Sequence, residues 1–216
     1  MDSKTKEKVR MQNKPFVIKP TKILAGAVAI YENVWDNHKE TIDCAESVTL
    51  DLKSGITFVP SQTSKDTATG DPFEQSIRTN YCLDLIPASK ISTDIKIITD
   101  QYSKLIFETL KGYIDIFDIH ESIKVSEDFG LLKYSSGEYY HSHYDGGTES
   151  GRSVSAILYL NDDYQGGEIE FANFNLTIKP KAGTFILFPS NYAYTHTAKP
   201  ILSGTKYAIV TWLHDR

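Results

Sequence analysis

Apolar residues between positions 91 and 119 recur every three or four residues, the spacing that places side chains on one face of an α-helix. Ser92 or Thr93 can cap the start of this segment, because a side-chain hydroxyl accepts a hydrogen bond from an amide of the first turn. The pattern predicts one long amphipathic helix. Its apolar face comprises Ile91, Ile95, Ile98, Tyr102, Leu105, Ile106, Leu110 and Tyr113.

Two weaker patterns precede this helix. Ile30, Val34, Ile42 and Ala45 fall near one helical face, which predicts a shorter helix from about Ala29 to Ser47. The following segment, residues 54–71, is rich in Ser, Thr, Gly, Pro and Asp, a composition typical of loops and hairpin connections. We expect this segment to be a mobile lid.

From residue 130 onward the pattern changes to short runs of β-branched and aromatic residues separated by turn signals. Many short strands at close spacing indicate a barrel or a double-sheet jelly roll. The expected fold is therefore α+β, a double-stranded β-helix (jelly-roll) core buttressed by one long helix and at least one shorter one. The expected strands are Val154–Leu160, Glu168–Phe171, Phe174–Ile178, Thr184–Phe188 and Tyr207–Leu213.

We expect one domain over residues 1–216, since this length is ordinary for a single packed core. Residues 1–28 would form an N-terminal extension and first strand, and residues 29–128 helical support and lid loops. Residues 129–216 would form the catalytic jelly roll. The sequence does not indicate an oligomeric state.

The charge of the chain argues against nucleic acid as a partner. The formal net charge is -5, with no basic stripe to match a phosphate backbone. The lysine-rich first twenty residues lack the apolar segment of a secretory signal, and the run Ile23–Ile30 is too short to span a bilayer. With only Cys44 and Cys82, expected to be free thiols, the sequence predicts a soluble cytoplasmic protein without a membrane partner.

A candidate metal site combines His143 and Asp145 with the distant His196. Two histidines and one carboxylate are the set that holds non-haem Fe(II) while leaving other coordination positions open. On a regular strand His141, His143 and Asp145 would all face the same way, so His141 is an alternative ligand, either instead of His143 or beside it. The closer spacing of His143 to Asp145 favours His143.

Four joined segments carry a family resemblance. The sequence is similar to the prolyl 4-hydroxylase group of Fe(II)- and 2-oxoglutarate-dependent dioxygenases over about residues 130–214, with the motifs in the same order. The segments are Tyr134-x-x-Gly137-x-x-Tyr140-x-x-His143-x-Asp145; Arg152–Asn161 followed by Gly166–Phe171; Pro180–Phe188; and His196–Trp212, which includes Lys206.

The resemblance implies roles for several further residues. Lys206, ten residues after His196, would bind the distal carboxylate of 2-oxoglutarate, since burying an unpaired charge is costly. Tyr159 would add a hydroxyl beside it, and Tyr134 would approach the metal-bound end of the cosubstrate. Trp212 has the strand parity of Lys206 and could wall a substrate pocket, and Arg152 could contact a substrate backbone.

The resemblance also implies an enzyme with Fe(II), 2-oxoglutarate and O₂ as cofactors and ascorbate as reductant. It would hydroxylate an unactivated C–H bond, with a peptidyl proline as the first expectation and a peptide or protein as partner. One alternative is an oxygenase for a free amino acid or another small molecule. The other is a metal-binding jelly roll without catalysis.

Overall fold

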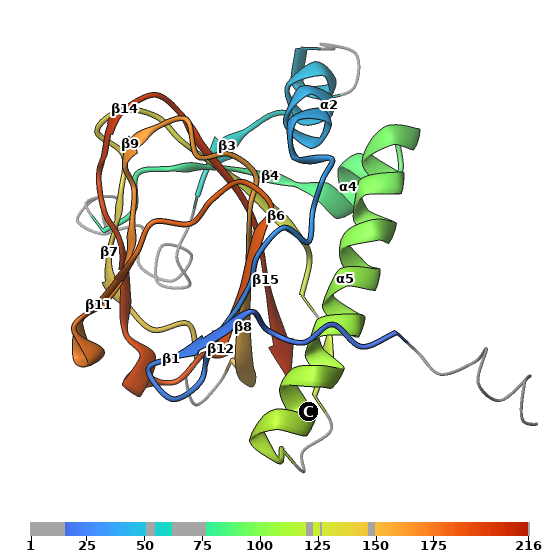
Figure 1. Ribbon diagram of the computed structural model, residues 1–216. Coiled ribbons are helices and arrows are strands. Elements are labelled where there is room, and N and C mark those ends of the chain that lie inside the picture. The colour runs from blue at the N-terminus through green and yellow to red at the C-terminus, as the bar shows by residue number, and fades with distance from the viewer. Residues whose placement is uncertain are drawn as a thin grey trace, which may run out of the picture.

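The computed structural model of this protein describes residues 16–50, 55–61, 77–119, 123–125, 127–146 and 150–215. The predicted lid lies mainly outside these residues, since only positions 55–61 of that segment are described. Two sheets face each other in the described part of the chain, as Figure 1 shows. They form the core in which the candidate site lies.

The large sheet has nine strands. In spatial order these are β1 (Lys22–Leu24), β2 (Val28–Tyr31), β12 (Thr184–Pro189), β8 (Arg152–Tyr159), β15 (Lys206–His214), β6 (Gly130–Tyr134), β4 (Tyr81–Asp84) and β3 (Val59–Pro60), with β5 (Lys124–Val125) also paired to β15. Its pairings are antiparallel. The central strands β12, β8 and β15 join segments that are far apart in the sequence.

The opposing sheet is shorter and carries part of the candidate site. It runs in the order β11 (Leu176–Ile178), β10 (Ile169–Phe171), β13 (His196–Ala198) and β7 (Tyr140–His143). A separate pair joins β14 (Ile201–Ser203) to β9 (Gln165–Gly166). Two facing antiparallel sheets with a helical layer outside confirm the predicted α+β jelly roll.

Strand residues of the large sheet alternate between two apolar layers. In β12, Phe185 and Leu187 pack toward the helices, whereas Ile186 and Phe188 face the interior between the two sheets. All four side chains are fully buried, and burying a side chain of this size contributes roughly 1.5–3 kcal/mol. This strand therefore reads as a continuous apolar run because neither of its faces meets water.

The long helix agrees closely with its prediction. Helix α5 spans Thr93–Phe117, and the hydroxyl of Ser92 accepts a hydrogen bond of 3.3 Å from the amide of Ile95. The helix ends where Asp118 adopts a left-handed conformation with φ of 50°. Its apolar face packs on the large sheet, where Tyr102 donates a 3.2 Å hydrogen bond to the carbonyl of Ile209. Helix α4 (Leu85–Ser89) precedes it.

The predicted shorter helix is wrong at its start. Residues Val28–Tyr31 form strand β2, and helix α2 begins at His38 and ends at Leu50. Ile30 pairs with Ile186 in β12, and every residue of β2 is buried. A short apolar run that is covered on both sides has no alternation, so its spacing cannot distinguish a strand from a helix.

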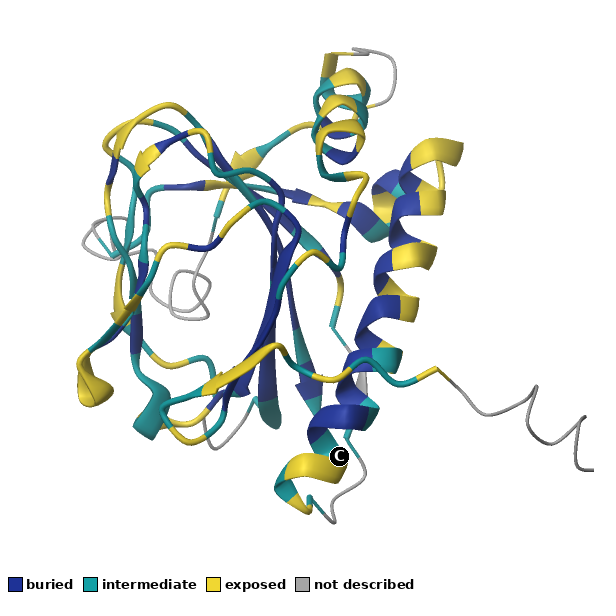
Figure 2. Cartoon of the chain, in the orientation of Figure 1, coloured by how far each residue is buried: buried dark blue, intermediate teal, exposed yellow. Residues whose placement is uncertain are grey.

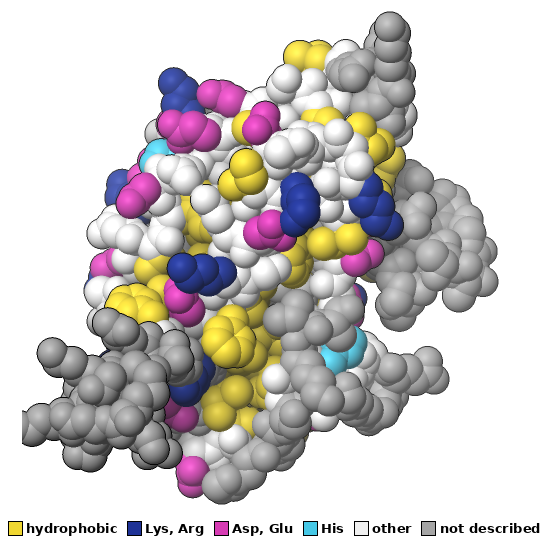
Figure 3. Space-filling view, turned by 90° about the vertical axis from the view of Figure 1, so that its right-hand side faces the viewer, with side chains coloured by type: hydrophobic (Ala, Val, Ile, Leu, Met, Phe, Trp, Pro, Cys, Tyr) yellow, Lys and Arg dark blue, Asp and Glu magenta, His cyan; other side chains and the backbone are white. Residues whose placement is uncertain are grey.

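Burial follows these layers in Figure 2, where the side of α5 that faces the sheet is buried and the opposite side is exposed. The surface on the right-hand side of Figure 1 carries both charged and apolar side chains. Figure 3 shows Lys, Arg, Asp and Glu side chains spread among apolar ones on this face. Cys44 and Cys82 are free thiols. In the described ranges no helix is long and apolar enough to cross a membrane. The cytoplasmic location stays a prediction.

Candidate active site

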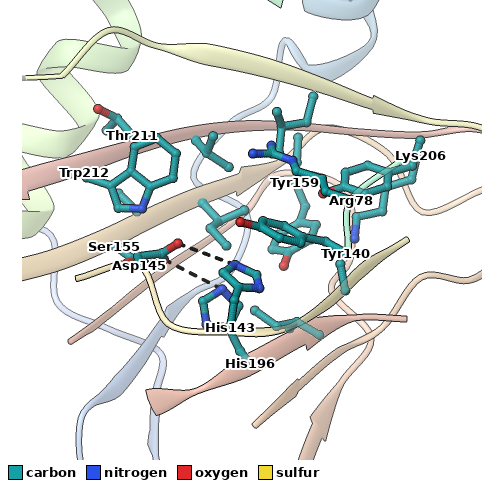
Figure 4. A pocket seen from close by; sticks show the side chains of 18 residues that line it. Arg78, Tyr140, His143, Asp145, Ser155, Tyr159, His196, Lys206, Thr211 and Trp212 are labelled. Atoms are coloured by element: carbon teal, nitrogen blue, oxygen red, sulfur yellow. Dashed lines mark hydrogen bonds and ion pairs between the residues drawn. The ribbon is translucent and has the colours of Figure 1, made fainter. Parts of the chain in front are cut away.

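Three side chains from two distant segments of the chain meet between the two sheets. The Nε2 atom of His143 lies 3.5 Å from Oδ1 of Asp145, and Nε2 of His196 lies 3.7 Å from Oδ2 of the same carboxylate. One ligand atom from each residue lies within 4.8 Å of the other two. Figure 4 shows Asp145 facing both imidazoles. The structure thus brings together the three residues predicted as metal ligands.

The hydrogen bonds of the two Nδ1 atoms indicate which ring nitrogen of each histidine can bind a cation. Nδ1 of His143 lies 2.7 Å from the carbonyl oxygen of His141, and Nδ1 of His196 lies 3.1 Å from that of Tyr194. A carbonyl only accepts hydrogen bonds, so each Nδ1 carries a proton, and in the neutral imidazole that a metal ligand requires each Nε2 has its lone pair toward Asp145. Lone pairs facing a carboxylate repel it unless a cation lies between them. The three residues therefore fit a divalent metal ion.

Burial adjusts the protonation of this group. It lowers the pKa of His196 to about 4, so the imidazole is neutral near pH 7, as a metal ligand must be. For Asp145, burial acts to raise the pKa, but His196, His143 and a hydrogen bond from Ser155 outweigh it and hold the pKa well below its usual range. Asp145 is thus a carboxylate throughout the neutral range.

A bulge in β7 separates His141 from His143. His143 pairs with His196 and Tyr140 pairs with Ala198, so three steps along β7 oppose two steps along β13. A bulge changes the alternation of side chains, and the ring of Tyr140 stacks on His143 with centroids 3.5 Å apart. His141 is exposed to solvent, and its ring contacts that of Tyr139. It is not among the residues that line the pocket. The expectation that His141 and His143 share a face is therefore wrong.

Lys206 reaches the same pocket from the opposite side to Asp145 (Figure 4). Only 3% of its surface is exposed, and its ammonium donates a 2.9 Å hydrogen bond to the carbonyl of Gly167. Burial lowers the pKa of Lys206 to about 7; the nearby Lys179 acts in the same direction and Glu168 opposes both. A buried cation at the end of a largely apolar pocket is suited to a ligand carboxylate.

Two predicted tyrosines flank this ammonium. Nζ of Lys206 lies 5.0 Å from the ring centroid of Tyr134 and 5.3 Å from that of Tyr159, and both tyrosines line the pocket. Burial raises the pKa of Tyr134 to about 12, against the effect of Arg78, and raises that of Tyr159 well above its usual value. Both hydroxyls are protonated near pH 7 and can donate a hydrogen bond.

The two predicted substrate residues meet at the mouth of the pocket. The guanidinium of Arg152 lies over the ring of Trp212, 3.8 Å from its centroid. Glu127 holds that guanidinium through two hydrogen bonds of 2.6 Å. Both residues line an outer groove next to the pocket, together with Arg78, Asp84, Glu127, Asp128, Tyr140 and Tyr144. Trp212 also lines the inner pocket, on the same side of β15 as Lys206.

Sequence reasoning missed three residues of this site. Arg78 lines both pocket and groove, with its guanidinium 4.6 Å from the centroid of the Tyr140 ring. Its Nε atom donates a 2.7 Å hydrogen bond to Asn80. Ser155 donates to Asp145, and Glu127 orients Arg152. Arg78 and Glu127 lie outside the four family segments, whereas strand alternation from Tyr159 could have placed Ser155 on the inner face.

The sequence and the fold both have known relatives. The 2OG-Fe(II) oxygenase superfamily matches residues 129–214. The prolyl 4-hydroxylase subunit alpha-1 of Gallus gallus is 29% identical over 112 residues, which cover 44% of this chain and 22% of the chicken protein. Human prolyl 3-hydroxylase 2 is 38% identical over 66 residues, covering 28% and 9%. This chain therefore spans less than half the length of these curated relatives.

Among solved structures, a prolyl hydroxylase from Trichoplax adhaerens, in complex with a peptide fragment of the hypoxia inducible factor oxygen degradation domain, has a TM-score of 0.70. The match covers 100% of this chain and 94% of the other at 20% sequence identity. At this identity the similarity establishes the fold. The similarity of fold extends beyond residues 129–214 to the helical layer.

Proposed function

We propose that this chain, whose residues 129–214 match the 2OG-Fe(II) oxygenase superfamily, is an Fe(II)- and 2-oxoglutarate-dependent dioxygenase that hydroxylates a proline in a peptide or protein. The observation that carries the proposal is a single pocket with the His143, Asp145 and His196 group at one end and the buried cation of Lys206 at the other. A simple metal-binding module has no use for a carboxylate anchor. This argues against the non-catalytic alternative.

The proposed roles follow from the position of each residue. His143, Asp145 and His196 would hold Fe(II), which with 2-oxoglutarate and O₂ supplies the oxidation of an unactivated C–H bond. Lys206 would bind the distal carboxylate of the cosubstrate, with a hydroxyl from Tyr159 beside it. Tyr134, on the other side of the ammonium, would donate toward the keto acid end. Ascorbate would serve as the reductant of the metal.

The outer groove supports a peptide as the substrate. It opens beside the group of His143, Asp145 and His196, called the metal group below. Aromatic and charged side chains line it, including Tyr140, Trp212 and Arg152. Aromatic walls suit a proline ring, and fixed donors suit peptide carbonyls. The similarity to both prolyl 4-hydroxylases and a prolyl 3-hydroxylase supports a proline target without selecting the ring carbon.

The test is cosubstrate turnover coupled to a peptide panel. With Fe(II), 2-oxoglutarate and ascorbate, we expect succinate to form faster with proline-containing peptides, and mass spectrometry to detect one added oxygen atom on proline. Matched peptides with alanine in place of each proline, and the Asp145→Asn variant, serve as controls. Hydroxylation of free proline or another small molecule would instead support the small-molecule alternative. If no succinate forms with any substrate, and none forms without substrate by uncoupled turnover, the proposal that this chain is an enzyme would be rejected.

A further inference from the structure

Two buried serines form a hydrogen-bonded chain that ends at the Asp145 carboxylate. The hydroxyl of Ser155 donates a 2.6 Å hydrogen bond to Oδ2 of Asp145, and the hydroxyls of Ser155 and Ser190 lie 2.8 Å apart. A carboxylate only accepts, so the proton of Ser155 is directed at Asp145. Ser155 must then accept from Ser190, and the chain of donors runs from Ser190 through Ser155 to Asp145.

Both serines are deep in the protein, since each exposes 1% of its surface. Ser155 lies in β8 opposite Phe188 of β12, and Ser190 directly follows the end of β12. A buried hydroxyl without a partner costs about 1–3 kcal/mol, so the two hydroxyls and the carboxylate stabilise one another's positions. Figure 4 shows Ser155 beside Asp145, at the edge of the metal group.

Ser190 also holds the backbone next to Asp145. Its carbonyl accepts a 2.7 Å hydrogen bond from the amide of Gly146, and its own amide donates to the carbonyl of Ser153 at 3.0 Å. A Cβ atom at position 146 would lie 2.9 Å from the Ser190 carbonyl oxygen and 3.0 Å from that of Arg152. The chain after Asp145 is therefore packed directly against Ser190, which fixes both the backbone and the side chain of the carboxylate residue.

We propose that Ser155 and Ser190 form a positioning relay that keeps Oδ2 of Asp145 engaged and leaves one carboxylate oxygen for the metal. A carboxylate limited to one metal-facing oxygen leaves coordination positions for the cosubstrate and O₂, whereas a freed carboxylate can bind through both oxygens. The inference rests on the proposed metal centre. It does not depend on whether the substrate is a proline.

The relay can be tested with Co(II) and the full chain in the absence of any substrate. We expect Ser155→Ala to lower Co(II) affinity by about 10- to 100-fold, the usual range for partners of metal ligands, and to alter the visible ligand-field spectrum. Ser190→Ala should have a smaller effect in the same direction. The double variant should match Ser155→Ala alone, because Ser190 acts through Ser155. Ser155→Thr keeps a hydroxyl and should restore the affinity.

Ser153→Ala is the matched control, since it removes a half-buried hydroxyl from the same strand. Thermal unfolding would establish that each variant is folded; if Ser155→Ala is not, Ser190→Ala decides alone. Wild-type affinity and spectrum in the folded serine variants would overturn the relay, as would equal losses in Ser153→Ala and Ser155→Ala or no recovery in Ser155→Thr. Failure of the wild-type protein to bind Co(II) would reject the metal centre itself, a different result.

Discussion

His143 and His196 are direct cross-strand partners in the short sheet, and their ring centroids lie 4.3 Å apart. Two of the three proposed metal ligands are therefore placed by a backbone ladder, although they are far apart in the sequence. Asp145 lies beyond the end of β7 and depends on side-chain contacts for its position. The metal group thus combines a rigid histidine pair with a carboxylate that neighbouring residues must orient.

This arrangement predicts different outcomes for His141 and His143, which lie two residues apart. His143→Ala should abolish Co(II) or Fe(II) binding, because it removes one of three ligands. His141→Ala should leave the metal affinity within about two- or threefold of wild type, since surface substitutions usually change free energies by less than about 0.5 kcal/mol. Calorimetric titration of the metal measures both. Loss of binding in His141→Ala alone would reverse the assignment.

The sequence was sufficient to predict which residues are candidate metal ligands, but not to predict the direction in which each side chain points. Family motifs and strand alternation together selected His143, Asp145, His196 and Lys206. Alternation alone left His141 as an alternative ligand. The bulge that turns it away depends on how β7 pairs with β13 and has no local signal in the sequence. Strand β2 was missed for a related reason: its burial on both faces results from pairing with β12, a long-range contact.

The cosubstrate end of the pocket predicts a strong effect of one charge. Lys206→Met should weaken 2-oxoglutarate binding by about 1.5–3 kcal/mol, on the order of 10- to 150-fold, because it removes a charge-assisted hydrogen bond. Lys179→Met is the matched control. Lys179 lowers the pKa of Lys206, so its loss should preserve binding and extend it to higher pH. Unchanged 2-oxoglutarate affinity in Lys206→Met would refute the anchor.

The same lysine predicts a pH dependence of folding in the ligand-free protein. The pKa of Lys206 is about 7 in the folded chain against an ordinary value of 10.5, so between these values the unfolded chain binds a proton that the folded chain does not. The free energy of unfolding should therefore rise with pH in this window, by up to about 1.4 kcal/mol per pH unit. Lys206→Met should flatten the rise in urea titrations. An identical slope in both proteins would contradict the assignment.

The turn that holds Lys206 predicts a contrast between two glycines. Gly166 has φ of +74°, and a Cβ there would lie 2.3 Å from the backbone oxygen of Pro200. Gly137 has φ of +87° and open space around it. Gly137→Ala should lower the free energy of unfolding by about 1–2 kcal/mol, the cost of placing a Cβ in the left-handed conformation. Gly166→Ala should cost clearly more in chemical denaturation and also weaken 2-oxoglutarate binding, because Gly167, whose carbonyl accepts from Lys206, is the next residue.

The substrate side of the site was least visible in the sequence. Arg78 and Glu127 carry no motif, and their roles depend on contacts with Tyr140 and Arg152 that only the folded chain creates. Most of the predicted lid lies outside the described residues. Substrate choice resides in such loops and in single side chains, which diverge while the core is retained.

Glu127 offers a test of the groove that leaves the metal and cosubstrate residues unchanged. Glu127→Gln removes the negative charge that holds Arg152 over Trp212, while Gln keeps a similar shape. A loosely held guanidinium must lose rotamer freedom when a peptide binds, so KM should rise several-fold with little change in kcat. Co(II) affinity should be unaffected.

Asp128→Asn is the control for this prediction, because Asp128 is an exposed neighbour that lines the same groove. Steady-state kinetics with a proline-containing peptide would compare the two variants. An equal rise in KM for both would indicate a general effect of negative charge on the groove. A loss of kcat without a change in KM would place Glu127 in the chemical step instead, because that pattern marks an interaction made only in the transition state.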